Sequence, residues 1–429
     1  MDRISHSALA PGLPAGPAFA RPNLNVSRVS GEMWVSFFTF ALLLFLPQTH
    51  GTAPIFLILI YAGLAIKHPG EVLRRIRGRW VLFAPGVFAF ISTFWSMDSV
   101  TTLRLSLELL FTIYMSLWLA GSRRWNDVVA GLAMAGMLYL LSSLVLGQTV
   151  MIGTVPGKEA FSGFNLGKNL FGDIAAIGIL AMVALHFQTW MQRPVVTMAL
   201  LLVLAIEVNA IILSQSAGAM VAAFGACAVM VFVVILTRVD AVVRAWLLIV
   251  TGLTALLGLL LFTVMGDVVM DNMMGLFHKD PTMTGRLYLW ARSKDIVDSH
   301  PWLGSGYNAF WVQGNLDAEG LWTWARIPTR TGFNFHSTII ENLVEVGYVG
   351  TTILVLTVLL GAMGLLRRAI RSGQTAAAFW VAILAYELSR FPIEALGPSP
   401  FYHTTVLVWV ALGMAWSDDD HGNRFARHA

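Results

Sequence analysis

The sequence predicts an all-α protein that crosses a membrane many times. Two observations lead to this prediction, the amino-acid composition and the hydropathy. The chain has 429 residues, of which 57% are apolar and 12% are charged, and its mean hydropathy is +0.70. A soluble domain carries about 25% charged residues. So little polar surface cannot cover a water-soluble particle of this size. A soluble enzyme, a nucleic-acid-binding protein and a disordered scaffold are therefore disfavoured.

Hydropathy divides the chain into tails, spans and one large loop. Residues 1–30 precede any apolar stretch, so we expect no cleaved signal peptide but a disordered cytoplasmic tail. A spanning helix needs about 20 apolar residues, and we predict about twelve, with a range of ten to twelve. They lie near 33–48, 52–67, 80–96, 103–120, 126–147, 170–189, 195–213, 217–236, 244–266, 337–366, 375–391 and 402–416. Nine spans thus fall within 31–266 and three within 337–416, separated by a loop over 267–336, and 417–429 forms a C-terminal tail.

Basic residues predict the orientation of these spans. With both termini in the cytoplasm, every short inner loop is basic, as the positive-inside rule requires. The inner positives are Arg3, Arg21, Arg28, Lys67, Arg74, Arg75, Arg77, Arg79, Arg123, Arg124, Arg193, Arg238, Arg244, Arg367, Arg368, Arg371, Arg424 and Arg427. Most of the remaining ones gather in two outer segments, 147–169 and 267–336.

The segment 267–336 is long enough to expect a function. We predict a short helix around 284–298, and the five tryptophans of the segment form either an interfacial belt or stacking platforms for sugar rings. The chain shows no convincing internal repeat, and this long connection follows the ninth span. Both features argue against a transporter built of two similar halves.

Two cations in these segments suit a phosphate. Lys168 follows the glycine-containing stretch 161–167 and precedes a span, and backbone N–H groups at a helix N-terminus favour anions. Arg286 heads the predicted helix and could bind phosphate with two nitrogens. The alternatives are an interfacial lysine in a flexible turn and an arginine paired with Asp295 or Asp298.

A third group lies where the long segment re-enters the membrane. His336 is followed by Glu341 and Glu345, which share a helix face, and Arg326 and Arg330 lie upstream. Carboxylates within a membrane are a functional hypothesis by default, and a histidine beside them suits a general base. Alternatively, the histidine caps the helix and Glu345 pairs with an arginine.

Arg390 ends a span three residues after Glu387. It could form a structural ion pair with Glu387, or it could contact a phosphate. No Asp-x-Asp motif and no metal-ligand spacing occurs in the outer segments 147–169 and 267–336, so we expect neither a metal nor a cofactor. The lone Cys227 excludes a disulfide within the chain.

Four stretches give the chain a resemblance to the O-antigen ligase and polysaccharide polymerase superfamily. They are Phe94-Trp-Ser-Met-Asp98, the Lys168-Asn169 loop ending at Gly172, Gly285-Arg286 with Pro301-x-x-Gly-x-Gly306, and His336 followed by Glu345, Gly347 and Gly350. Their order and outer placement match over residues 94–350. Two positions depart from the pattern. Ser337 stands where the family often has asparagine, and Leu213–Gly218 lacks the arginine of many ligases, which favours the polymerase branch.

The resemblance implies a GT-C-like fold and an inverting, metal-independent glycosyltransferase of the bacterial inner membrane with a periplasmic active site. The donor would be an undecaprenyl-diphosphate-linked oligosaccharide. A polymerase would use a sugar hydroxyl of another lipid-linked repeat unit, and a ligase would use lipid A-core. His336, Arg286 and Glu345 are the implied catalytic residues. The implied pyrophosphate-binding residues are Lys168, Asn169, Arg326, Arg330 and Arg390.

The acceptor glycan, the lipid bilayer and chain-length or export proteins are the expected partners, without nucleic acid. A flippase of the same lipid-linked oligosaccharide is the alternative from another class.

Overall fold

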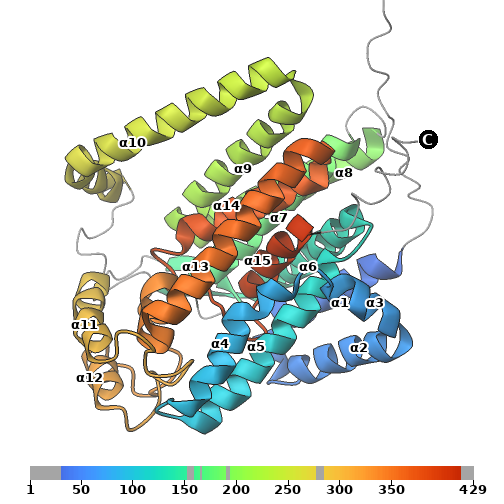
Figure 1. The fold of residues 1–429 in the computed structure, drawn as a ribbon. Coiled ribbons are helices and arrows are strands. Elements are labelled where there is room, and N and C mark those ends of the chain that lie inside the picture. Colours follow the sequence, from blue (N-terminus) through green and yellow to red (C-terminus); the bar gives the residue numbers. More distant parts are fainter. Residues whose placement is uncertain (1–29, 152–158, 165–166, 190–193, 277–284, 417–429) are drawn as a thin grey trace, which may run out of the picture.

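The computed structural model describes residues 30–151, 159–164, 167–189, 194–276 and 285–416, which are almost wholly helical (Figure 1). The α-helices are α1 (Gly31–Leu44), α2 (Ala53–Lys67), α3 (Pro69–Ile76), α4 (Ala84–Ile91), α5 (Ser99–Ala120), α6 (Trp125–Leu146), α7 (Lys168–Thr189), α8 (Pro194–Ser214), α9 (Ala217–Arg238), α10 (Ala241–Leu276), α11 (Arg286–Ser299), α12 (Leu316–Trp324), α13 (Thr338–Ser372), α14 (Thr375–Arg390) and α15 (His403–Gly413). Short 3-10 turns are η1 (Leu46–Thr49), η2 (Trp80–Phe83), η3 (Ser92–Phe94) and η5 (Met414–Trp416). Strands β1 (Gln148–Met151) and β2 (Glu159–Gly163) pair antiparallel.

The chain is a multi-pass membrane protein. Seven of the described helices are long and apolar enough to cross a membrane, or eight if the bent pair α2 and α3, which turns by 104°, forms one span. Each of the twelve predicted spans falls on a helical stretch, but α1, α2, α4, α14 and α15 are shorter than 18 residues. The number twelve therefore stays a prediction. The predicted tails lie outside the described residues, apart from Ser30, which caps α1.

The helices differ sharply in what surrounds them. Every residue of α15 is buried, and it packs against α5, α13 and α14, while α7 packs against α6, α8, α9 and α14. Close approach depends on small residues: a Cβ on Gly361 of α13 would come within 2.5 Å of Leu412 on α15. By contrast, α10 lies at the edge of the molecule (Figure 1), and its stretch Ala241–Gly258 buries nothing. An apolar helix without protein neighbours faces lipid.

The described part of the long segment, residues 285–336, packs on one end of α13 (Figure 1). The short helix predicted around 284–298 is confirmed as α11, which contacts α13. A small hydrophobic core of its own joins α11, α12 and α13, and it includes Leu289, Phe310, Trp322, Phe335 and Val344. The segment is therefore a built unit rather than a loose connection.

A break in α13 holds this unit in place. Gly347 has non-helical angles (φ 64°, ψ −170°) inside the helix, so backbone groups on both sides lose their helical partners. Four hydrogen bonds replace them: Ser305 N to Val344 O (2.9 Å), Gly306 N to Glu345 O (2.8 Å), Tyr348 N to Pro301 O (2.8 Å) and Val349 N to Trp302 O (3.1 Å). Buried backbone groups are nearly always paired. A side chain on Gly304 or Gly347 would collide with the opposite backbone, so both positions need glycine.

Candidate functional site

The Phe94–Asp98 stretch packs against residues 301–306, the segment that fills the break in α13 and that we call the scaffold loop. The indole N–H of Trp95 donates to Leu303 O (3.0 Å), and Met97 N donates to Ser305 O (2.9 Å). Gly306 lies against Ser96 so closely that a Cβ there would overlap the serine side chain. Three of the four resemblance stretches, distant in sequence, therefore form one scaffold at the start of α13.

His336 is held at the edge of that scaffold by the peptide before it. Phe335 N donates to Glu341 Oε2 (2.8 Å), and Phe335 O accepts from Trp290 Nε1 (2.9 Å). His336 itself has a left-handed backbone, with φ at 52°, a conformation that a non-glycine residue adopts only where its surroundings enforce it. Ser337 then caps α13 by accepting from Ile340 N. The backbone of His336 is thus fixed in position immediately before a helix N-terminus.

The surroundings of His336 favour its neutral form. Partial burial and the nearby positive charge of Arg286 both lower the pKa of His336 below its usual value, and the carboxylate of Glu394 partly opposes this. Neither ring nitrogen is hydrogen-bonded to another residue in the described part of the chain. A neutral imidazole with an available nitrogen can accept a proton near neutral pH.

Glu394 hydrogen-bonds to residues from three different helices. Its Oε1 accepts from Arg286 Nη2 (3.1 Å) and from Asn169 Nδ2 (3.3 Å), and Arg286 Nη1 also donates to Ile393 O (2.6 Å). Thr338 N donates to the backbone carbonyl of Glu394 (3.0 Å). Asn169, Arg286 and Thr338 lie in the first turns of α7, α11 and α13, so three helix N-termini meet at one residue.

Lys168 extends this arrangement toward α9. Its Nζ donates to Gln215 O (2.9 Å), and the Asn169 side chain also accepts from Ser216 Oγ (3.2 Å) at the start of α9. We call Lys168, Asn169, Arg286, His336 and Glu394 the polar junction. Helix N-termini carry partial positive charge and unpaired N–H groups. With Arg286 and Lys168 added, the junction is chemically suited to an anion such as a phosphate group.

The two glutamates after His336 have different surroundings. Glu341 is nearer, and its carboxylate holds Trp311 Nε1 (2.6 Å) as well as the Phe335 peptide. Glu345 is buried one turn deeper and accepts from the backbone N–H of Asn308. Within the described residues, therefore, Glu341 positions the histidine and Glu345 supports the scaffold loop.

Among the described residues, the carboxylate of Glu394 pairs with Arg286 and not with the three remaining predicted arginines. Arg326 and Arg330 are exposed on the chain after α12, and Arg330 pairs with Glu319 (3.2 Å). Arg390 is buried and pairs with Asp173 on α7. Asp173 also accepts from Tyr386 Oη (2.7 Å) and contacts His403 Nε2 (2.9 Å). We call Asp173, Tyr386, Arg390 and His403 the buried cluster.

Comparison with known proteins gives two findings. A family model described as O-antigen ligase matches residues 200–355. The exopolysaccharide production protein ExoQ of Rhizobium meliloti (strain 1021) is 29% identical over 358 residues, which cover 81% of this chain and 80% of the relative. Both findings support the resemblance of this chain to the O-antigen ligase and polysaccharide polymerase superfamily. The family match includes Arg286, His336 and Glu345, whereas Lys168 and Glu394 lie outside residues 200–355.

Glu394 and His403 were not predicted from the sequence. Glu394 lies in the proline-interrupted connection 392–400, which carries no periodicity, and its partner Arg286 is 108 residues away. A carboxylate just after a span was the one available signal. His403 begins α15 in an otherwise apolar stretch, and a lone intramembrane histidine deserved the same functional hypothesis as the glutamates.

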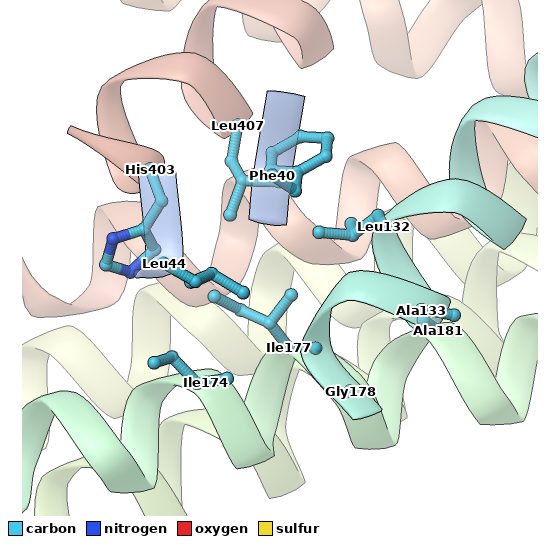
Figure 2. Close-up of a pocket in the computed structure, with 11 residues that line it drawn as sticks. Phe40, Leu44, Leu132, Ala133, Ile174, Ile177, Gly178, Ala181, His403 and Leu407 are labelled. Carbon is cyan, nitrogen blue, oxygen red and sulfur yellow. The ribbon is translucent and has the colours of Figure 1, made fainter. Parts of the chain in front are cut away.

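A small cavity lies away from the polar junction. It offers about 10 Å³, close to the space for one water, and its walls come from α1, α6, α7 and α15 (Figure 2). The ring of His403 is at one side, and the other labelled side chains are apolar, among them Phe40, Ile177 and Leu407. No residue of the polar junction lines it, so this cavity belongs to the helix packing and not to the candidate site.

Proposed function

We propose that this protein is a polysaccharide polymerase of the exopolysaccharide or O-antigen type. It transfers a glycan from an undecaprenyl-diphosphate carrier to a sugar hydroxyl of another lipid-linked repeat unit. The observation that carries the proposal is the polar junction, where a half-buried histidine lies near an arginine at the meeting point of three helix N-termini. The similarity to the superfamily supports the reaction class, a glycosyltransferase-like or ligase activity.

The proposed residues have two roles: one accepts a proton from the acceptor hydroxyl, and the others stabilise the leaving group. His336 accepts the proton of the attacking hydroxyl as that oxygen bonds to the anomeric carbon of the donor. The bond from the anomeric carbon to the phosphate oxygen breaks, and lipid pyrophosphate leaves with an additional negative charge. Arg286 and Lys168 stabilise that charge, together with the N-terminus of α7. We propose inversion at the anomeric carbon, because one direct displacement suffices for one base and one leaving-group site.

Glu394 holds Arg286 and Asn169 in place before the donor binds. The pyrophosphate oxygens then take over part of the arginine's hydrogen bonds, since the guanidinium has five N–H donors and Glu394 and Ile393 use two. Arg286 and Lys168 also remove the need for a metal to balance charge. We propose that chelators leave the activity of the purified protein unchanged, and activity that disappears with a chelator would contradict this.

Location follows from the same proposal. We propose that both termini lie in the cytoplasm and the polar junction at the periplasmic face of the inner membrane, and the basic inner loops support this orientation. The lipid-linked donor would reach the junction from the bilayer, beside the apolar faces of α8 and α10.

A ligase is the second candidate, because the matching family model is described as O-antigen ligase. Two observations favour the polymerase. The stretch Leu213–Gly218 holds no arginine, and the relative that matches over four-fifths of both chains is named for exopolysaccharide production.

Removal of the gene separates the candidates by what accumulates. A lost polymerase leaves single lipid-linked repeat units exposed on the periplasmic side. A lost ligase leaves finished polymer on the carrier and lipopolysaccharide without it, and a lost flippase leaves repeat units facing the cytoplasm. The proposal expects the first outcome, and either of the others would contradict it.

A further inference from the structure

Two aromatic side chains beside the polar junction are exposed together. Tyr288 of α11 and Trp324 at the end of α12 have ring centroids 4.4 Å apart and planes tilted by 30°. Tyr288 is 43% exposed and Trp324 is 42% exposed. Large aromatic side chains normally bury their faces, and a contiguous exposed aromatic surface usually marks an interaction site.

The surroundings of this pair indicate that it faces water. Arg292 and Asp295 follow Tyr288 by four and seven residues, so the three share one face of α11. Both charged residues are exposed and pair with each other at 2.8 Å. Lipid would not accommodate such a face.

A second exposed aromatic pair in the same segment contrasts with it. Trp302 and Tyr348 meet edge to face, with centroids 6.2 Å apart, and they are 68% and 47% exposed. Tyr348 begins the part of α13 whose Leu356 and Leu359 are exposed apolar residues. That pair has the environment of an interfacial belt, and it therefore serves as a control.

The water-facing pair is physically continuous with the polar junction. The indole of Trp324 covers Gly285, where a Cβ would lie 2.6 Å from the ring, and Gly285 has φ at 85°. The next residue, Arg286, reaches Glu394 and Ile393. A ligand whose phosphate lies at Arg286 would thus extend its adjoining portion past Tyr288 and Trp324.

We propose that Tyr288 and Trp324 form a glycan subsite that binds a pyranose ring of the repeat unit. This inference rests on the proposed function. The apolar C–H face of a sugar stacks on the aromatic surface, while its hydroxyls remain hydrated or meet the exposed Arg326 nearby in sequence. The subsite holds the glycan while His336 and Arg286 act on the bond to the phosphate, so it sets affinity for the sugar rather than the rate of the chemical step.

The test uses the full chain in detergent and the oligosaccharide repeat unit released from the producing bacterium's own polymer. This probe lacks pyrophosphate, so binding is measured without turnover. Trp324→Ala and Tyr288→Ala should each weaken binding by about tenfold, Trp324→Phe should restore most of it, and Trp302→Ala should leave it unchanged. Equal affinities in wild type and Trp324→Ala would overturn the subsite.

Turnover of the lipid-linked repeat unit provides the second readout. Trp324→Ala should raise KM about tenfold and leave kcat within about twofold, which is the signature of lost uniform binding. Varying donor and acceptor concentrations separately shows whose sugar occupies the subsite. A wild-type protein that binds the oligosaccharide but forms no polymer would contradict the proposed function and leave the subsite standing. Polymer formation with an unchanged KM in both alanine variants would contradict the subsite and leave the proposed function standing.

Discussion

Arg390, at the end of α14, and Glu394, four residues later, each belong to an arginine–carboxylate pair, and the two pairs differ in exposure. In the buried cluster, the side chains of Arg390 and Asp173 are 6% and 1% exposed. In the polar junction, those of Arg286 and Glu394 are 18% and 21% exposed. Arg390 O accepts from both Ile393 N (2.9 Å) and Glu394 N (2.8 Å), so the buried pair anchors the turn that carries the exposed one.

The difference in exposure separates a structural pair from a reactive one. Removing one partner of a dry ion pair leaves an uncompensated charge, so such a pair is fixed. A partly exposed pair is screened by water, contributes less net stability and can exchange partners with a substrate. We therefore expect the buried cluster to determine folding and the polar junction to determine catalysis, and the following predictions test that division.

The largest effect is expected at His336. His336→Ala should lower the rate of polymer formation by about 10²- to 10⁴-fold, because no other positioned base replaces it. Protein accumulation in the membrane should be normal. His300→Ala is the matched control, since His300 is an exposed histidine of the same segment, and it should keep activity. Comparable losses in both variants would break the assignment.

Asp173→Ala tests the other side of the comparison. It leaves the Arg390 guanidinium buried with Glu387 as its remaining carboxylate at 3.8 Å, and it should lower the free energy of unfolding by roughly 3–5 kcal/mol. Glu394→Ala should cost less than about 1 kcal/mol. Thermal unfolding in detergent measures both. Equal losses would show that exposure does not separate the two pairs.

Arg286 should matter for the rate and little for the fold. Arg286→Ala should reduce turnover by about 10²- to 10³-fold through lost stabilisation of the leaving pyrophosphate. Arg286→Lys should retain part of it, because lysine keeps the charge but not the two-nitrogen geometry. Arg292→Ala, on the exposed face of the same helix, is the control and should behave as wild type. Initial rates with a lipid-linked repeat unit would show whether this ranking holds.

The smallest effect concerns pH. The pKa of His336 is lowered, so the neutral base is present at pH 7, and activity should fall as the pH drops through a value below the ordinary 6.5. Glu394→Gln removes a negative charge that favours the protonated ring, so the acid limb of the rate profile should move to still lower pH, by less than about one unit. A shift to higher pH would contradict the arrangement of charges around the histidine.

Much of the fold followed from local pattern. Long apolar stretches became α5 to α10 and α13, and the helix headed by Arg286 was predictable from its spacing. Glycines at 304, 306 and 347 were visible as motif positions. Their reason, the break in α13 that the scaffold loop fills, was not, because it arises from contacts between backbones some 40 residues apart in the sequence.

The candidate site was predictable in its cations and its histidine but not in how they are joined. Arg286 and Arg390 look alike in sequence, and only packing reveals that one reaches a partly exposed carboxylate and the other a buried one. Glu341 and Glu345 share a helix face, yet the break at Gly347 and the loop around Asn308 give them different partners. The hairpin β1–β2 had no periodic signal, because each strand has only four or five residues.

The most direct test of the central claim is reconstitution of the purified chain with a defined undecaprenyl-diphosphate-linked repeat unit. We expect oligomers longer than one repeat and the release of one undecaprenyl diphosphate for each new glycosidic bond. Neither product should form with His336→Ala, and both should form with His300→Ala. Polymer formation by His336→Ala at the wild-type rate, or carrier release without any new glycosidic bond, would contradict the claim that the polar junction carries out glycan transfer.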